Sequence, residues 1–538
     1  MKKMKKLFSM AALALVGATF TGCSSSDDNI IDQPQQPEVI KSNVVTMTTT
    51  VGLDGGGDAT RALAADGKKT FAAGETMALV YKNTGGSTVK VVSTALTDAD
   101  ITDGGKSATF TFELTDPDKA QEVTYIYPAA MANADGTVNY SALNSQNGTL
   151  ASLAANLDYC TKSGAWDGDN LPTLTLENQL AILAVTLKNE DGSSEITGST
   201  TKLTLSDGTN TYNVNRSAAD GPIYVAIRPT TEATISIQAI NGSQGYYKTL
   251  TTTKSYAANN GYSVSWRMTQ GANLSLLTAA YTAQNGDKLT GTLGSNVKIS
   301  IADGATVTLK DVNINGSGTW TSGNYAGITC AGDATITLEG TNTVKGFYEK
   351  YPGIFVSSGK TLIINGTGEL NASSNGSYDT GSSGAGIGGG YEMNCGNIEI
   401  QSGIVTATGN KRCAGIGGGY NASCGNITIS GGTVNATGGQ YGAGIGGGRR
   451  FSANVSCGNI TISGGTITAT GGEDAAGIGG GRGNNNIYKS SCGTITITSG
   501  VTSVTATKGN SNAQSIGAGR YGTCGAVTIE DSSKVTQN

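Results

Sequence analysis

The sequence predicts an all-β protein: a β-sandwich region followed by a C-terminal right-handed parallel β-helix of roughly seven or eight coils. Two observations predict this fold class. Near-copies of one segment fill the C-terminal region, and short strands of period two occur throughout without helical spacing long enough for a crossover helix. Composition agrees, since 80 of the 538 residues are glycine and only 14% are charged.

Five near-copies share a glycine-rich run and a Cys-Gly pair. From each of the first three repeated cysteines to the next alanine the step is 19 residues, whereas the return steps from alanine to cysteine are 10, 10, 14 and 16 residues. One part of the repeat is therefore rigid and one loop takes the insertions, as in stacked coils. The repeated cysteines are Cys395, Cys424, Cys457, Cys492 and Cys524.

The rigid part alternates apolar and polar residues. Ile427 and Ile429 flank Thr428, and the same alternation returns one copy later. This is the pattern of a strand with one buried face. We expect each copy to form one coil, coils to stack at about 4.8 Å, and equivalent residues to form ladders. Degenerate copies extend the β-helix over 289–538, behind a linker at 271–288.

The N-terminus indicates export. Residues 1–22 have a basic start and a short apolar core, which predict a signal peptide. Phe20 to Cys23 resembles a bacterial lipobox, which implies lipidation of Cys23; the alternative is a plain secretory signal. Residues 23–43 read as a flexible tether. The acidic patch behind Cys23 resembles the surface-export signal of Bacteroidetes lipoproteins, which implies a lipid-anchored, surface-exposed protein of the outer membrane.

Residues 44–270 carry short alternating strands without a repeat, which favours a β-sandwich. The segments DATRALAADGKKTFAAGETMALVYKN, VTYIYPA and LTLENQLAILAVTLKN resemble the fimbrillin family of Bacteroidetes surface and pilus proteins. The resemblance implies two sandwich subdomains, fimbrial subunits as partners and proteolytic processing after Arg61; the alternative for Arg61 is an ordinary exposed loop residue. Pilus subunits of that family end in a donor strand, whereas this chain continues into the β-helix.

Several site classes are excluded or disfavoured. The chain contains no histidine, which excludes catalytic triads and zinc sites built on histidine. A net charge of −5 gives no case for nucleic-acid binding. Gly384 to Gly389 satisfies G-x-G-x-x-G, but a strand rather than a helix follows, so we expect tight corners and no cofactor. We expect the cysteine ladder to be free thiols with no metal; disulfide bonding stays open.

One ladder of equivalent residues has side chains suited to binding a ligand. The residue six positions after each of the four alanine anchors is aromatic or basic, and so is the equivalent residue of the last copy, which is aligned on Ile516. Aromatic faces stack on sugar rings and guanidinium groups bind carboxylates, so this ladder would suit an extended polymer. The alternative is a solvated edge that shields the glycine corner. The candidate ligand-binding residues are Tyr391, Tyr420, Arg449, Arg482 and Arg520.

The repeats also resemble β-helical domains of bacterial surface proteins, including a carbohydrate-binding family. We therefore expect a non-catalytic adhesin or fimbria-associated protein that binds a polysaccharide or a host cell-surface glycan through the β-helix. Two alternatives remain: a polysaccharide lyase, which would need Arg or Lys beside a carboxylate cluster, and a structural spacer or fimbrial component.

Overall fold

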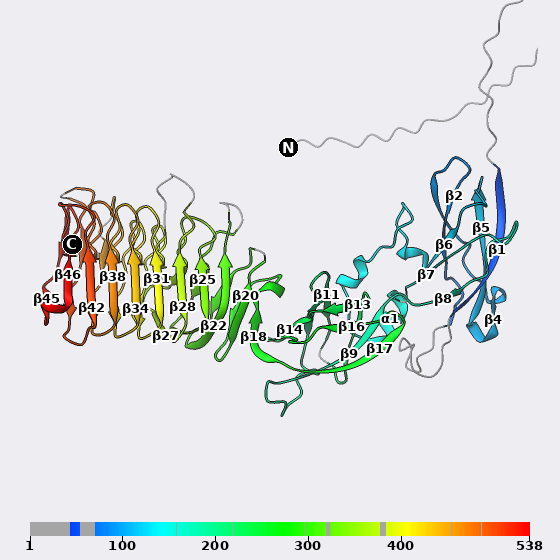
Figure 1. Cartoon of the computed structure of the whole chain (residues 1–538), viewed down its shortest axis with the longest axis horizontal. Helices are drawn as coiled ribbons and strands as arrows, with labels where there is room; N and C mark the ends of the chain where they lie inside the picture. Colours follow the sequence, from blue (N-terminus) through cyan, green and yellow to red (C-terminus); the bar gives the residue numbers. More distant parts are fainter. Residues whose placement is uncertain are drawn as a thin grey trace, which may run out of the picture. The chain divides into compact units, whose positions relative to one another are not determined.

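The computed structural model describes residues 43–53, 70–157, 159–217, 219–294, 296–318, 323–376, 384–452, 455–485 and 487–538 (Figure 1). The expected signal peptide, Cys23, nearly all of the tether and Arg61 lie outside these residues. From Val44 to Asn538 the chain forms one compact unit. It is almost entirely β, as the sequence predicts.

The first part of the sandwich region packs two sheets around aromatic side chains. In β5 every second residue points inward, so Phe110 and Phe112 are buried against Tyr125 and Tyr127 of the facing sheet. One sheet contains β4 (Ile101–Thr102), β5 (Ser107–Thr115), β1 (Val44–Leu53) and β8 (Thr175–Leu176), and the other contains β3 (Thr88–Val92), β2 (Ala78–Lys82), β6 (Val123–Tyr127) and β7 (Cys160–Gly164).

The second part has its own core, built on the apolar strand β9 (Ala181–Lys188). A short helix, α1 (Leu150–Asn156), is capped by the Thr149 side chain, which accepts a hydrogen bond from the Ser152 N–H. The remaining strands are β12 (Ile223–Ile227) and β17 (Asn260–Arg267) beside β9; β10 (Lys202–Ser206), β11 (Thr211–Asn215), β14 (Ser236–Asn241), β15 (Gln244–Thr249) and β18 (Thr269–Asn273) in a second sheet; and the pair β13 (Thr230–Ala233) and β16 (Lys254–Tyr256).

Hydrogen bonding continues from this second sheet into the first coil. β18 pairs with β15 on one side and, in parallel, with β20 (Lys288–Thr292) on the other. Within the expected linker at 271–288, β19 (Tyr281–Ala283) pairs with β21 (Ile299–Ile301). This segment therefore carries strands of the coil stack rather than a plain connection.

The C-terminal region is a parallel β-helix whose strands stack coil on coil (Figure 1). A typical coil has β33 (Ile427–Ile429) and β34 (Thr433–Thr437) around one corner, then β35 (Ile445–Gly446). The inward residues of β33 and β34 are fully buried aliphatic side chains, as the alternation predicts. The sheet that contains β35 has nine strands: eight lie within 289–538, in agreement with the seven or eight coils expected, and β19 precedes them in the expected linker.

Equivalent strands fall into a few ladders. The first holds β22 (Ala305–Asn315), β24 (Ala334–Glu339), β27 (Thr361–Gly366), β30 (Asn397–Ile400), β33, β37 (Ile460–Ile462), β41 (Ile495–Ile497) and β45 (Val527–Ile529). The second holds β25 (Thr341–Lys345), β28 (Glu369–Ser373), β31 (Ile404–Thr408), β34, β38 (Thr466–Thr470), β42 (Ser503–Thr507) and β46 (Val535–Gln537). The third holds β19, β21, β23 (Ile328–Cys330), β26 (Ile354–Val356), β29 (Ile387–Gly388), β32 (Ile416–Gly417), β35, β39 (Ile478–Gly479) and β43 (Ile516–Gly517).

The glycine-rich run is dictated by close approach between coils. Gly446 has φ 130°, and a Cβ at this position would overlap the Gly479 carbonyl oxygen of the next coil. The same contact joins Gly417 to Gly446. Glycine is therefore needed at this corner for both its backbone conformation and its lack of a side chain, which confirms the corner interpretation of G-x-G-x-x-G.

Four of the five repeated cysteines stack in register, as predicted. Cys424 pairs with Cys457, Cys457 with Cys492, and Cys492 with Cys524, all in parallel. The longer loops add a fourth ladder that ends at these cysteines, formed by β36 (Val455–Cys457), β40 (Ser490–Cys492) and β44 (Gly522–Cys524). The insertions therefore fall in the loop that the repeat spacing identified.

Candidate functional site

Backbone hydrogen bonds align the predicted ladder residues with loop residues of the preceding coil. The N–H of Arg449 donates to Arg412 O (2.6 Å), that of Arg482 to Tyr441 O (3.0 Å), and that of Tyr391 to Lys350 O (2.8 Å). These bonds interleave two sets of side chains into one row along the β-helix. We call this row the column: Lys350, Tyr391, Arg412, Tyr420, Tyr441, Arg449, Asp474, Arg482, Arg520 and Tyr521.

The N-terminal end of the column is aromatic. The rings of Tyr391 and Tyr420 lie 5.5 Å apart with a 43° tilt. Tyr420 is only 6% exposed and packs on Cys413. The Lys350 ammonium lies 5.1 Å from the Tyr391 ring centroid, and the Arg412 guanidinium lies 4.9 Å from that of Tyr420. Cations thus already occupy part of the aromatic surface through cation–π contacts.

The middle of the column is cationic. The guanidinium groups of Arg449 and Arg482 each lie 4.6 Å from the Tyr441 ring centroid, and Phe451 lies 5.7 Å from Arg449. The Nε atoms of Arg449 and Arg482 are buried and make no hydrogen bond with any residue that the structure describes. Burial, followed by the nearby charge of Arg412, lowers the pKa of Arg449 below its usual value.

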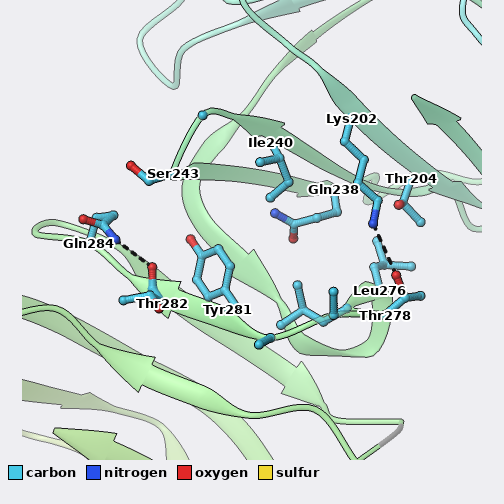
Figure 2. Close-up of a pocket in the computed structure, with 14 residues that line it drawn as sticks. Lys202, Thr204, Gln238, Ile240, Ser243, Leu276, Thr278, Tyr281, Thr282 and Gln284 are labelled. Atoms are coloured by element: carbon cyan, nitrogen blue, oxygen red, sulfur yellow. Dashed lines mark hydrogen bonds between the residues drawn. The ribbon is translucent and has the colours of Figure 1, made fainter. Parts of the chain in front are cut away.

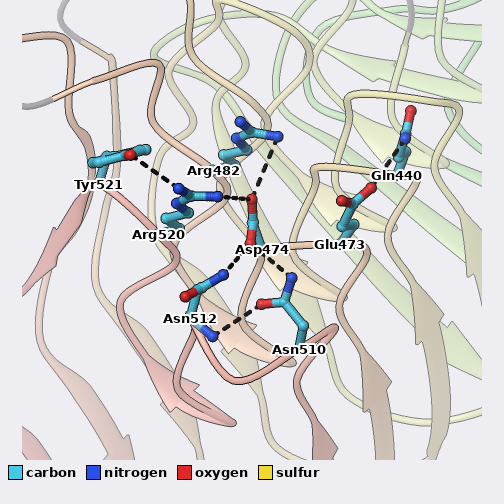
Figure 3. A network of polar contacts seen from close by, with 8 residues as sticks. All are labelled: Gln440, Glu473, Asp474, Arg482, Asn510, Asn512, Arg520 and Tyr521. Carbon is cyan, nitrogen blue, oxygen red and sulfur yellow. Dashed lines mark hydrogen bonds and ion pairs between the residues drawn. The ribbon is translucent and has the colours of Figure 1, made fainter.

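At the C-terminal end, Asp474 holds two arginines (Figure 3). Its Oδ2 lies 3.4 Å from Arg482 Nη1 and 3.2 Å from Arg520 Nη1, and its side chain is only 2% exposed. Asn510 and Asn512 donate to Oδ1 at 2.7 and 3.1 Å. Burial alone would raise the pKa of Asp474, but these amides and the two guanidiniums outweigh burial and hold the pKa below its usual value.

The structure therefore brings all five predicted ladder residues into one column, but not as five freely exposed side chains. Tyr420 is buried, and the other four are half-buried. Two of the three arginines share Asp474, so their charge is partly neutralised. Arg449 pairs with no carboxylate among the described residues, which makes it the arginine best placed to accept an anion.

Sequence reasoning missed half of the column. Lys350, Arg412, Tyr441 and Asp474 all stand two positions before the anchor position of their copies. Because these residues differ in type, no repeated chemistry marked them. Their position in the repeat was the usable signal. A second variable residue at a fixed offset from the anchor must form its own ladder, and stacking of the coils places that ladder beside the predicted one.

A second candidate site is a cavity of about 340 Å³ between β10, β14 and the segment 276–284 (Figure 2). Leu276, Ile240 and Tyr281 contribute apolar surface. Its polar groups have protein partners: Lys202 Nζ donates to Thr278 Oγ1 at 3.3 Å, and the Tyr281 hydroxyl donates to Asp287 Oδ2 at 2.6 Å. This cavity offers less for recognising a charged ligand than the column does.

Two other kinds of site are absent from the same described ranges. Cys, Asp and Glu side chains there do not gather into a group of three that could hold a metal ion. No helix in those ranges is long and apolar enough to cross a membrane.

The comparisons give one family and a set of solved structures. A family described as a beta helix repeat matches residues 398–420, 427–449 and 460–482. The chain is similar to a fimbrial assembly protein from Parabacteroides distasonis, with 10% identity, a TM-score of 0.25, and coverage of 41% of this chain and 91% of that one. It is also similar to the tip fimbrial protein Mfa3 from Porphyromonas gingivalis, with 11% identity, a TM-score of 0.23, and coverage of 41% and 94%. No match is found among curated proteins.

Proposed function

We propose that this protein is a lipid-anchored adhesin of the bacterial cell surface that binds an extended acidic glycan along the column. The observation that carries the proposal is Arg449. Its guanidinium is half-buried between aromatic rings, lies beside Arg412 and Arg482, and has no carboxylate partner among the described residues. An anion from a ligand would supply the missing negative charge.

The arrangement of the column favours a polymer over a small ligand. The five ladder positions repeat at the coil spacing, so they span roughly 19 Å, four steps of about 4.8 Å. Each contact is partly solvated and contributes little by itself, about 1 kcal/mol or less. Repetition along one chain converts such contacts into useful affinity.

The surface location in this proposal rests on the N-terminal sequence. Lipidation of Cys23 would anchor the chain in the outer membrane, and the fimbrillin-like segments suggest fimbrial subunits as additional partners. Both the lipidation and the processing after Arg61 are part of the proposal.

The direct test is titration of the full-length mature protein with polygalacturonate, a carboxylated polymer, and with neutral dextran. We expect long polygalacturonate to bind, its short oligomers to bind poorly, and dextran not to bind. Added salt should weaken binding, because exposed charges are screened. Equal binding to both polymers, or to neither, would contradict the acidic-glycan proposal and favour a spacer. Release of unsaturated products from polygalacturonate would favour the lyase alternative.

A further inference from the structure

A second feature of the β-helix is a ladder of five cysteines, independent of the column. We call it the cysteine ladder: Cys395, Cys424, Cys457, Cys492 and Cys524. Four are buried and Cys524 is half-buried, and all are thiols in the structure. From Cys424 to Cys524, neighbouring cysteines face one another across parallel strands, and Cys395 precedes them, with its N–H donating to Ser423 O at 2.9 Å.

The sulfurs are not evenly spaced along the cysteine ladder. Cys424 Sγ lies 2.8 Å from Cys457 Sγ, and Cys492 Sγ lies 2.7 Å from Cys524 Sγ. Both separations approach the bonded sulfur–sulfur length of about 2.05 Å. Cys395 also interacts with the Cys424 thiol, but its Sγ is directed to Gly417 O at 3.4 Å. The ladder is thus divided into two close pairs and one remaining thiol.

We infer that Cys424–Cys457 and Cys492–Cys524 are disulfide bonds in the exported protein, and that Cys395 stays a thiol. Directly paired residues on parallel strands lie about 4.8 Å apart, which falls within the Cα range of disulfides, about 4.4–6.8 Å. Bond formation therefore needs only a small movement of the sulfurs. This inference departs from the expectation of free thiols and adopts the disulfide alternative that the sequence left open.

The chemistry requires an oxidant, which we take to be a disulfide of a thiol oxidase or of a small molecule in the oxidising compartment. The thiolate of one cysteine attacks that disulfide and displaces one of its sulfurs as a thiol. The second cysteine then attacks the mixed disulfide, forms the new sulfur–sulfur bond and releases the other thiol. The protein loses two protons and two electrons, and the oxidant gains both.

The two bonds would lock neighbouring coils together. In a stacked repeat, the free energy of unfolding is approximately the sum of the intrinsic stability of each coil and the contact energies between neighbouring coils. A disulfide between Cys424 and Cys457 links residues 33 positions apart, and one between Cys492 and Cys524 links residues 32 positions apart. Each bond therefore prevents adjacent coils from separating, in the half of the β-helix that carries the cationic part of the column.

Peptide mapping tests the pairing directly. The full-length protein is isolated from the envelope of the exporting cell, quenched in acid, alkylated under denaturing conditions and digested with trypsin. Lysines and arginines such as Lys411, Arg449 and Lys489 separate the five ladder cysteines onto different peptides. We expect two cross-linked peptide pairs that disappear on reduction, with Cys395 alkylated before reduction. Cys160, Cys330 and Cys413 lie outside the ladder and should also be alkylated before reduction.

Variants separate pairing from folding. Cys457→Ser should remove the Cys424–Cys457 cross-link and keep the Cys492–Cys524 cross-link. The matched control Cys395→Ser removes a ladder cysteine of the same environment and should keep both. Full alkylation of Cys424, Cys457, Cys492 and Cys524 without reduction would overturn the inference. So would a different pairing in the unmodified chain, such as Cys395 with Cys424.

Discussion

Arg520 contacts Asp474 twice: its backbone N–H donates to Asp474 O at 2.8 Å, and its Nη1 lies 3.2 Å from the Asp474 carboxylate. The backbone hydrogen bond follows from the stacking of the coils. The ion pair depends on which side chains occupy the two stacked positions. The same carboxylate also forms an ion pair with Arg482. Asp474 therefore sets how much positive charge the column leaves for a ligand.

Replacing Asp474 with Asn tests this role. The variant removes the negative charge between Arg482 and Arg520, so both become available to an anionic polymer. We expect tighter binding to polygalacturonate, by about two- to fivefold, together with a loss of about 1–3 kcal/mol in unfolding free energy. Titration and denaturant unfolding measure the two effects. Weaker polymer binding by a folded Asp474→Asn variant would contradict the assigned role.

The stabilisation by Asp474 should depend on pH. Because the pKa of Asp474 is lower in the folded protein than its usual value, its contribution is complete above the ordinary pKa of about 3.9. That contribution is lost as pH falls through the folded pKa. Unfolding free energies of the wild type and Asp474→Asn should differ at pH 7 and converge in strong acid. A constant difference across this range would rule out the ionised carboxylate as its source.

Gly446 should not tolerate a side chain. Gly446→Ala places a Cβ against the Gly479 carbonyl in a backbone conformation that alanine disfavours, and we expect at least about 2 kcal/mol of destabilisation. Gly359→Ala is the matched control, because Gly359 also has positive φ (76°) but open space around it. It should cost about 1 kcal/mol. Equal losses of unfolding free energy would show that the contact between coils is unimportant.

Cys23→Ala tests the proposed anchor. A lipoprotein is held in the membrane by several acyl chains on one cysteine, which together give stable anchoring. The variant should move from the membrane fraction to the soluble fraction in cell fractionation. Retention in the membrane after a salt wash would mean that Cys23 is not the anchor.

The β-helix was predictable because stacked coils require the same residue types at equivalent positions, so the sequence is periodic. Ile427 and Ile429 recur as Ile460 and Ile462 because the same inward positions are filled in every coil. The sequence assigns Thr269–Asn273 to the boundary between sandwich and linker and Tyr281–Ala283 to the linker, because these strands pair with the first coils without carrying the repeat. Their assignment depends on backbone hydrogen bonding between distant segments.

The candidate site was predictable only in outline. The offset of Arg449, Arg482 and Arg520 from their anchors placed them in one ladder. The carboxylate of Asp474 could not be matched with Arg482 and Arg520, because it lies in a different loop and occurs in one copy only. Local sequence also did not show that Tyr420 is buried, since its burial depends on packing with Cys413 from the preceding loop.

The most direct measurement of the central claim is the affinity of Arg449→Gln for long polygalacturonate at low salt. Gln keeps a polar, although shorter, side chain and removes the cation that has no carboxylate partner. The account predicts a loss of about three- to tenfold with an unchanged unfolding transition. Lys489→Gln, which removes an exposed charge from the next variable loop, should bind as the wild type does. Unchanged affinity in Arg449→Gln, or an equal loss in Lys489→Gln, would contradict the column as the binding site.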